Sequence, residues 1–164
     1  TAGTRPRGFL YAGPMIDKTG APKVMEFNGR FGAPETQPIM MRLGSDLAAH
    51  CLAACESRLL EETITWSSDA TIGVVLASEH YPASSPTGLV VEGLGEEPQG
   101  VKVFHAGTSI NQDTTVTSGG RVLCVTAKGA SLADAASAAY QAIGPISWEG
   151  MKYRSDIGWR ALAR

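Results

Sequence analysis

The sequence has few cysteines, and the three that it has are poorly placed for cross-linking or for binding zinc. Cys51 and Cys55 lie four residues apart in a segment with helical periodicity, and Cys124 lies in an apolar, strand-like segment. An odd number of cysteines at these spacings excludes a disulfide framework and offers no zinc-ligand motif. A reducing compartment, the cytoplasm, is therefore expected.

Long apolar runs and an excess of charge of one sign are also lacking. No apolar run approaches the roughly 20 residues that a membrane-spanning helix needs, and the start, TAGTRPRG, has no apolar signal-peptide core. The 14 basic and 16 acidic residues give a net charge of −2, so no global field attracts a nucleic-acid backbone or an anionic membrane. We therefore expect no nucleic-acid partner and no membrane association. Because the first residue is Thr1 rather than Met, we also expect the chain to be part of a longer protein.

With 43% apolar residues, the 164-residue chain is long enough for one domain or two small ones. The first part predicts a β-hairpin, with strands from Gly8 to Met15 and from Lys23 to Phe31 joined by a turn at Asp17 to Gly20. Two helices are predicted next, the second capped by Ser45 or Asp46. These helices run from Gln37 to Leu43 and from Asp46 to Leu59, and the second has Leu47, Cys51, Leu52 and Cys55 at helical spacing.

A second unit is predicted to begin near Glu62, where short strands alternate with turn clusters. One helix, from Ser131 to Ile143, follows the strands, with Ser131 as its cap, Asp134 completing a capping box, and an apolar stripe that includes Ala135 and Ala139. The pattern favours an α+β fold with a small, mostly antiparallel β-domain. The predicted strands are Thr71 to Ser78, Gly88 to Glu92, Val101 to His105, Thr114 to Thr117 and Gly120 to Ala127, and Ile146 to Tyr153 is predicted to close the unit as strand and turn.

Three polar residues occupy alternate positions of the second predicted strand, namely Glu26, Asn28 and Arg30. Alternate residues of a strand share one face, so a carboxylate, an amide and a guanidinium are expected side by side. Oxygen ligands of this kind suit a hard cation such as Mg²⁺ and leave room for phosphate oxygens, while arginine pairs with an anion. The arrangement suits phosphoryl transfer. The spacing alone, however, favours a simpler interpretation, in which these residues are the solvated face of an edge strand.

A second candidate site lies at Ser118-Gly-Gly-Arg121. Two glycines bring backbone amides close to a ligand, and the guanidinium that follows them is suited to a phosphate. The alternative is a hairpin turn followed by an arginine on the surface of a strand.

The other charged and aromatic residues are interpreted as structural. His105 ends an apolar strand and is interpreted as a turn residue, while His50 and His80 have no partner at metal-ligand spacing. Near the carboxyl end basic and aromatic residues alternate, but acidic neighbours argue against a nucleic-acid surface, and we expect Arg154 and Asp156 to pair.

Longer strings carry a specific resemblance to a known family. They cover nearly all residues after Arg7, and they resemble the end of the ATP-grasp region and the carboxy-terminal domain of glycinamide ribonucleotide synthetase (phosphoribosylamine-glycine ligase). The strings are GFLYAGPMIDKTGAPKVMEFNGRFGAPETQPIMMRLGSDL, VFHAGT, SGGRVLCVTAKGASLADA and SWEGMKYRSDIGWRAL.

The resemblance implies that residues 1–61 are the carboxy-terminal segment of an ATP-grasp domain and that residues 62–164 are a carboxy-terminal domain resembling a barrel-sandwich hybrid. It also implies an ATP-dependent ligase of purine biosynthesis that joins glycine to phosphoribosylamine and releases ADP and phosphate. Family members carry most of the ATP-binding region upstream. The chain is therefore expected to be inactive without a complementing amino-terminal half.

By the same resemblance, Glu26 and Asn28 match the residues that bind Mg²⁺ (or Mn²⁺) beside the ATP phosphates. Arg30 matches a catalytic and substrate-binding arginine, and Arg121 matches a position that contacts the substrate's phosphate. Ala33 departs from the pattern, because the family usually has an aspartate there that is expected to orient the amine-bearing substrate. Its loss predicts weaker transition-state stabilisation, on the order of several kcal/mol.

Two smaller departures, Pro14 and Gly29, are expected to loosen the hairpin. Together with Ala33 they leave open an alternative, in which the chain is a noncatalytic binding or assembly module derived from the ligase. A swinging-arm carrier is a third alternative, but the nearest candidate lysine, Lys18, lies in the first unit rather than at a hairpin tip of the β-domain.

Overall fold

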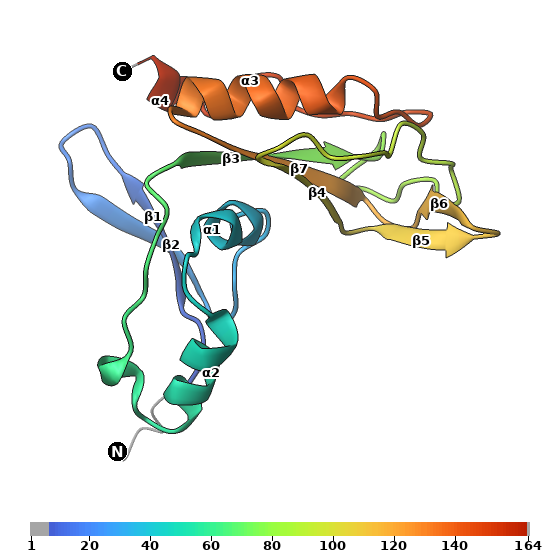
Figure 1. Ribbon diagram of the computed structural model, residues 1–164. Coiled ribbons are helices and arrows are strands. Elements are labelled where there is room, and N and C mark those ends of the chain that lie inside the picture. The colour runs from blue at the N-terminus through green and yellow to red at the C-terminus, as the bar shows by residue number, and fades with distance from the viewer. Residues whose placement is uncertain (1–6, 164) are drawn as a thin grey trace. The chain divides into compact units, whose positions relative to one another are not determined.

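The computed structural model describes residues 7–163, and the start segment that bears on the signal-peptide expectation lies largely outside them. The chain divides into two compact units (Figure 1). The first comprises Thr1–Thr36 and Leu43–Ser67, and the second comprises Gln37–Arg42 and Ser68–Arg164. The domain boundary expected between residues 61 and 62 stays a prediction.

The first unit begins with the predicted hairpin, formed by β1 (Tyr11–Ile16) and β2 (Pro22–Asn28) in antiparallel register. The Asp17 carboxylate accepts hydrogen bonds from the backbone N–H of Thr19 and Ala21 and from the Thr19 hydroxyl. These bonds fix the turn, and they hold the pKa of Asp17 below its ordinary value. The register shifts between Gly13 and Pro14, because proline has no N–H to donate to the ladder.

The second predicted helix ends earlier in the structure than the sequence predicts. Asp46 caps α2 (Leu47–Cys55) by accepting from the N–H of Ala48 and Ala49. The prediction extends the helix to Leu59, but α2 ends at Cys55 and Ser57 is left-handed. Leu59 instead begins a short 3₁₀ turn, η1 (Leu59–Glu61). The buried residues of α2 are His50 and Ala53.

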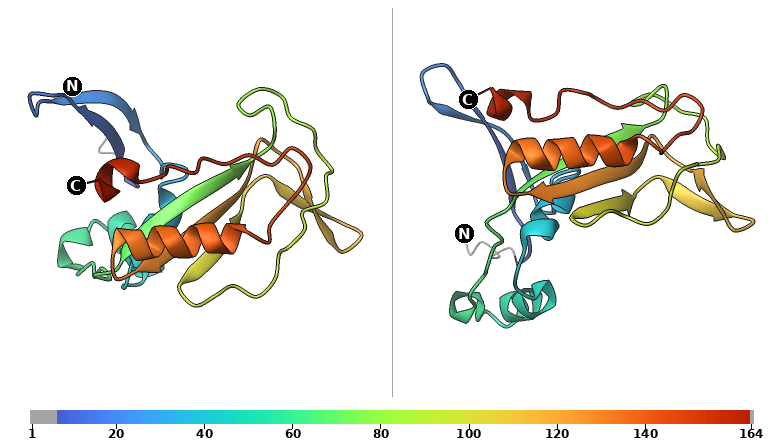
Figure 2. Two further views of the ribbon diagram at one scale, coloured as in Figure 1. Left: turned by 90° about the horizontal axis from the view of Figure 1, so that it is seen from above. Right: turned by 45° about the horizontal axis from the view of Figure 1, so that its top comes forward.

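The second unit is built on an antiparallel sheet in the order β3-β7-β4, with α3 on one face (Figures 1 and 2). The strands are β3 (Ala70–Ala77), β7 (Arg121–Gly129) and β4 (Val101–His105), and the helix is α3 (Leu132–Ile143). A second hairpin, β5 (Thr108–Asn111) with β6 (Thr114–Thr117), extends beyond one end of this sheet. The remaining helices are α1 (Thr36–Arg42) and α4 (Trp159–Leu162).

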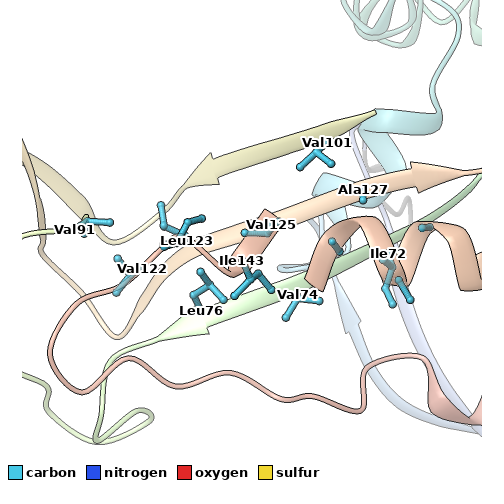
Figure 3. Close-up of a cluster of buried hydrophobic side chains, with 14 of the residues drawn as sticks. Ile72, Val74, Leu76, Val91, Val101, Val122, Leu123, Val125, Ala127 and Ile143 are labelled. Carbon is cyan, nitrogen blue, oxygen red and sulfur yellow. The ribbon is translucent and has the colours of Figure 1, made fainter. Parts of the chain in front are cut away.

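The core of the second unit lies between α3 and the sheet (Figure 3). Alternate residues of β3 point into it, and Ala135, Ala136, Ala139 and Ile143 of α3 meet them, which confirms most of the predicted stripe. Ser131 and Asp134 form the predicted capping box at the start of this helix. Fully buried members of the core include Val74, Leu76, Val122, Leu123 and Val125.

Most of the predicted second unit is confirmed, and so is the α+β class with a small, mostly antiparallel β-domain. The segment predicted as a strand at 88–92 instead makes isolated bridges, from Val90 to Val116 and from Glu92 to Ser147. The segment 146–153 likewise forms bridges, at Ser147 and Lys152, rather than a strand. Within the described part of the chain, no helix is long and apolar enough to cross a membrane.

Candidate functional site

Strand pairing in the first hairpin places the two predicted metal ligands on one face. Tyr11 pairs with Asn28, and Gly13 pairs with Glu26. Residues directly opposite each other on antiparallel strands project to the same side, so these four residues share a face. Glu26 is exposed and Asn28 is half-buried.

Arg30 lies beyond the strand. Strand β2 ends at Asn28, and residues 29–30 form a bend in which the Arg30 guanidinium donates to the Phe31 carbonyl over 2.8 Å. The alternation that groups Glu26 with Asn28 therefore does not extend to Arg30, and the prediction that all three share one strand face is wrong. Its assigned role as a substrate contact stays a prediction.

A second carboxylate, that of Glu35, lies beside this face through its contact with Tyr11. The sequence analysis did not predict either residue as part of the site. A Cβ added to Gly13 would lie 3.3 Å from one edge of the Tyr11 ring, and one added to Gly32 would lie 3.1 Å from the other. The phenol hydroxyl donates to a Glu35 carboxylate oxygen at 3.5 Å. The Glu35 charge raises the pKa of Tyr11, and burial and the Glu26 charge add to the effect.

Glu35 belongs to the string that carried the prediction of a metal site, but no periodicity points to it. It follows the loop after β2 rather than lying in the strand, and the loop brings it to Tyr11. The available signal was the pairing of Tyr11 with Asn28, which requires the hairpin register to be known. Ala33 is exposed in the same loop.

The donor set of this face fits a hard divalent cation that keeps much of its own hydration. Glu26 and Asn28 offer a carboxylate and an amide oxygen, which Mg²⁺ accepts together with waters and phosphate oxygens. Gly13, opposite Glu26, leaves open the space that a side chain would fill, since a Cβ there would lie 3.2 Å from the Glu26 Cγ. No cluster of three or more His, Cys, Asp or Glu side chains is found among residues 7–163.

The second candidate site, at Arg121, begins β7 in the second unit, where the two glycines before it are closely packed. The Ser78 N–H donates to the Gly120 carbonyl and its hydroxyl to the Gly119 carbonyl. A Cβ at Gly120 would lie 2.7 Å from the Tyr81 ring. Close packing thus favours glycine at position 120, and the Arg121 side chain is exposed beside it.

The three histidines make local contacts. His105 is the last residue of β4, and its Nδ1 lies 3.1 Å from the hydroxyl of Thr108, which begins β5 after the turn. Buried His50 lies 2.7 Å from the Ser45 hydroxyl, and exposed His80 lies 3.8 Å from the Glu79 carboxylate.

The predicted ion pair near the carboxyl end is confirmed. The Arg154 guanidinium donates to both carboxylate oxygens of Asp156, at 2.8 and 2.7 Å. This bidentate pair lowers the pKa of Asp156 and raises that of Arg154.

A cleft of about 500 Å³ lies on the α3 side of the second unit. The loop 93–99 covers it, Val101, Val103 and His105 of β4 form one wall, and Gln141 and Ala142 of α3 form another. Neither candidate site lies in this cleft, because its lining includes none of the residues assigned to them.

Comparisons with known proteins show the class to which this fold belongs. Residues 71–160 match the family described as Phosphoribosylglycinamide synthetase, C domain, and the chain belongs to that family. It is 57% identical over 159 residues to the phosphoribosylamine–glycine ligase of Escherichia coli K12, an alignment that covers 96% of this chain and 37% of that protein. It is 55% identical over 158 residues to the ligase of Vibrio vulnificus CMCP6, with the same two coverages.

A solved structure agrees with these relatives. The crystal structure of phosphoribosylamine–glycine ligase from Thermotoga maritima superposes with a TM-score of 0.75 at 29% identity, over 90% of this chain and 36% of that one. The chain thus spans little more than a third of the length of the curated relatives that it matches.

Proposed function

We propose that the chain is the carboxy-terminal part of an ATP-dependent ligase that joins glycine to 5-phosphoribosylamine, releases ADP and phosphate, and operates in purine biosynthesis in the cytoplasm. The observation that carries the proposal is the 57% identity to the E. coli ligase across 96% of the chain. The hairpin face supports it, because Glu26 and Asn28 stand together there with the ligand types that the reaction needs.

Glu26 and Asn28 would hold Mg²⁺ (or Mn²⁺), with Tyr11 and Glu35 beside them. When bound, the cation would neutralise negative charge on the phosphate oxygens during phosphoryl transfer. Arg30 would stabilise the anionic transition state or the bound substrate, and Arg121 would contact the substrate's phosphate. In this scheme residues 1–61 end an ATP-grasp domain, and residues 62–164 form the carboxy-terminal domain of the synthetase.

The proposed partner is the ATP-binding amino-terminal half, which the relatives carry and which would be needed for turnover. The first hairpin supports this, since apolar side chains on both of its strands are exposed, including Met25 at 67% and Phe27 at 62%. Exposed apolar area of this kind is typical of a surface that another part of a protein covers.

The test combines the chain with an amino-terminal half taken from a relative and measures ADP formation that depends on glycine and phosphoribosylamine. Glu26→Gln removes the charged ligand and should lower turnover by roughly a hundredfold or more. Glu61→Gln, at a glutamate that is 70% exposed in the same unit, is the matched control and should leave turnover unchanged. Full turnover in Glu26→Gln would reject the metal site.

The second candidate is a noncatalytic binding or assembly module, which Ala33 favours because it lacks the carboxylate expected at that position. The same assay separates the two. A module would bind the amino-terminal half without supporting turnover. Glu26→Gln would then leave ADP formation unchanged, because there would be none to lower.

A further inference from the structure

Two cationic residues lie on either side of one small residue in the sheet of the second unit. Ala77, at the end of β3, pairs with Arg121 of β7. On its other side Ala77 pairs with Lys152, and the two residues exchange backbone hydrogen bonds of 2.8 Å in both directions. The register of β3 and β7 shifts between Leu76 and Ala77, where Val122 is an extra residue of β7, and both Val122 and Leu123 are fully buried. Beyond this bulge Arg121 projects to the side of Ala77, so Arg121, Ala77 and Lys152 form a row across three neighbouring chain segments.

This row lies on the face of the sheet away from the core. Leu76 is fully buried in the core, and successive residues of a strand point to opposite faces, so Ala77 points away from it. Gly73, four residues earlier and on the same face as Ala77, packs against Pro38 of α1 rather than against α3. Arg121 and Lys152 are both exposed.

The spacing of the row suits a small anion. Neighbouring strands lie about 4.8 Å apart, so the backbones of Arg121 and Lys152 are separated by roughly 10 Å. Ala77 places only a methyl group between them, and both cationic side chains are long enough to reach a ligand above it. A guanidinium offers a planar fork of donors to a phosphate, and an ammonium offers a mobile point charge.

Neighbouring contacts order this end of the sheet. The Lys152 ammonium donates to the Glu79 carbonyl at 3.2 Å, which draws its side chain along β3 toward the loop that follows it. The Tyr81 ring packs over Gly120, next to Arg121. Glu79 carries the nearby carboxylate; its oxygen lies 3.8 Å from His80 and next to Gly150.

We propose that Arg121, Ala77 and Lys152 form a binding site for a phosphate monoester, in which Lys152 is a second cation that contacts the phosphate opposite Arg121. The identity of the ligand rests on the proposed function, which calls for a sugar phosphate substrate. The row itself rests on the strand pairing alone.

Calorimetric titration of the 164-residue chain with ribose 5-phosphate, without ATP or Mg²⁺ and at fixed ionic strength, tests the site. Ribose, which lacks the phosphate, is the control ligand. Lys152→Met keeps the aliphatic stem and should weaken binding about tenfold, and Arg121→Lys should weaken it through loss of the fork. Ala77→Val adds bulk between the two cations, which are both retained, and it should also weaken binding.

Lys128→Met is the matched control, at an exposed lysine toward the other end of β7, and it should leave the affinity unchanged. Equal effects of Lys152→Met and Lys128→Met, equal binding of ribose, or no binding of ribose 5-phosphate would each overturn the site. Its failure is distinct from failure of the proposed function, because the ligase assay can succeed while this titration shows no role for Lys152, and the titration can succeed while turnover is absent.

Discussion

At the residue scale, Glu97 shows how a single carboxylate fastens a loop to an edge strand. One of its oxygens accepts from the Lys102 ammonium at 2.8 Å, and the other accepts from the Val103 N–H at 2.8 Å. Strand β4 is the edge of the sheet, so this side chain satisfies a backbone donor on that edge. The hydrogen bond from Lys102 is the main cause that holds the pKa of Glu97 below its ordinary value of 4.5.

Because the pKa of Glu97 is lower in the folded than in the unfolded protein, its contribution to stability is present above about pH 4.5 and is lost as the pH falls through the folded-state value. Glu97→Gln should therefore flatten the decline of unfolding free energy in acid. At neutral pH it should cost roughly 0.5–1 kcal/mol, since the side chain is 28% exposed. Urea unfolding monitored across this pH range measures both effects.

Glu96→Gln, at the exposed neighbouring glutamate, is the control and should leave the acid slope as it is. An unchanged slope in Glu97→Gln would contradict the assignment of this carboxylate as a pH-dependent fastening of the loop.

At the scale of the element, α3 depends on its first turn as well as on its apolar stripe. The Ser131 hydroxyl oxygen accepts from the Asp134 N–H, and the Asp134 carboxylate accepts from the Ser131 N–H, both at 3.1 Å. Two N–H groups at the start of the helix are thus satisfied by side chains. Gly129 precedes this turn without a side chain, since a Cβ there would lie 2.7 Å from the Ala135 nitrogen.

Ser131→Ala removes the cap and should lower the unfolding free energy of the second unit by about 1 kcal/mol, whereas Ser131→Gly should cost only a few tenths. Ser137→Ala, at an exposed position within the same helix, is the control and should be neutral or slightly stabilising. Denaturant midpoints at constant slope measure the three variants. Equal midpoints for Ser131→Ala and Ser137→Ala would show that the cap contributes nothing.

At the scale of the whole molecule, the two units differ in how much apolar surface they bury. The buried apolar cluster belongs entirely to the second unit. Among the residues described, twelve of the eighteen large exposed apolar side chains belong to the first unit, and Leu60 is fully exposed. Burial of apolar area is the main source of stability, so the two units should differ in resistance to opening.

Hydrogen exchange on the 164-residue chain should show this difference. Amides of β3 and β7, which lie next to the core, should exchange through openings that approach global unfolding, while those of β1 and β2 should exchange far faster through local opening. Exchange followed by NMR or mass spectrometry resolves the strands. Protection of the first hairpin equal to that of β7 would contradict the prediction.

Several elements could be predicted from the sequence because their signals are local. The turn at Asp17 to Gly20 lies between two apolar runs, and the box of Ser131 and Asp134 precedes an apolar stripe, so the first hairpin and α3 follow from neighbours in the chain. Strand β4 has the predicted bounds, Val101–His105, because its signal also comes from neighbouring residues in the chain. Strand β5 escaped prediction, because its polar residues pair with β6 and three of its four residues are exposed.

The candidate sites also contain residues that local patterns indicate and residues that only the fold brings together. The sequence places Glu26 and Asn28 on one face because alternation within one strand is a local rule, whereas grouping Arg30 with them extends that rule past the end of the strand. Glu35 was missed because its approach to Tyr11 depends on a loop and on the pairing of two strands.

The sequence by itself determined the family of this protein, the order of its main elements and the ligand types available to a cation, because each of these is written in local patterns and in strings of residues. Only the tertiary structure decided that Tyr11 contacts Glu35 on the hairpin face of Glu26, and that Ala77 separates Arg121 from Lys152. Those neighbours come from distant parts of the chain. Strand register and loop closure bring them together, and neither is set by the residues of one segment alone.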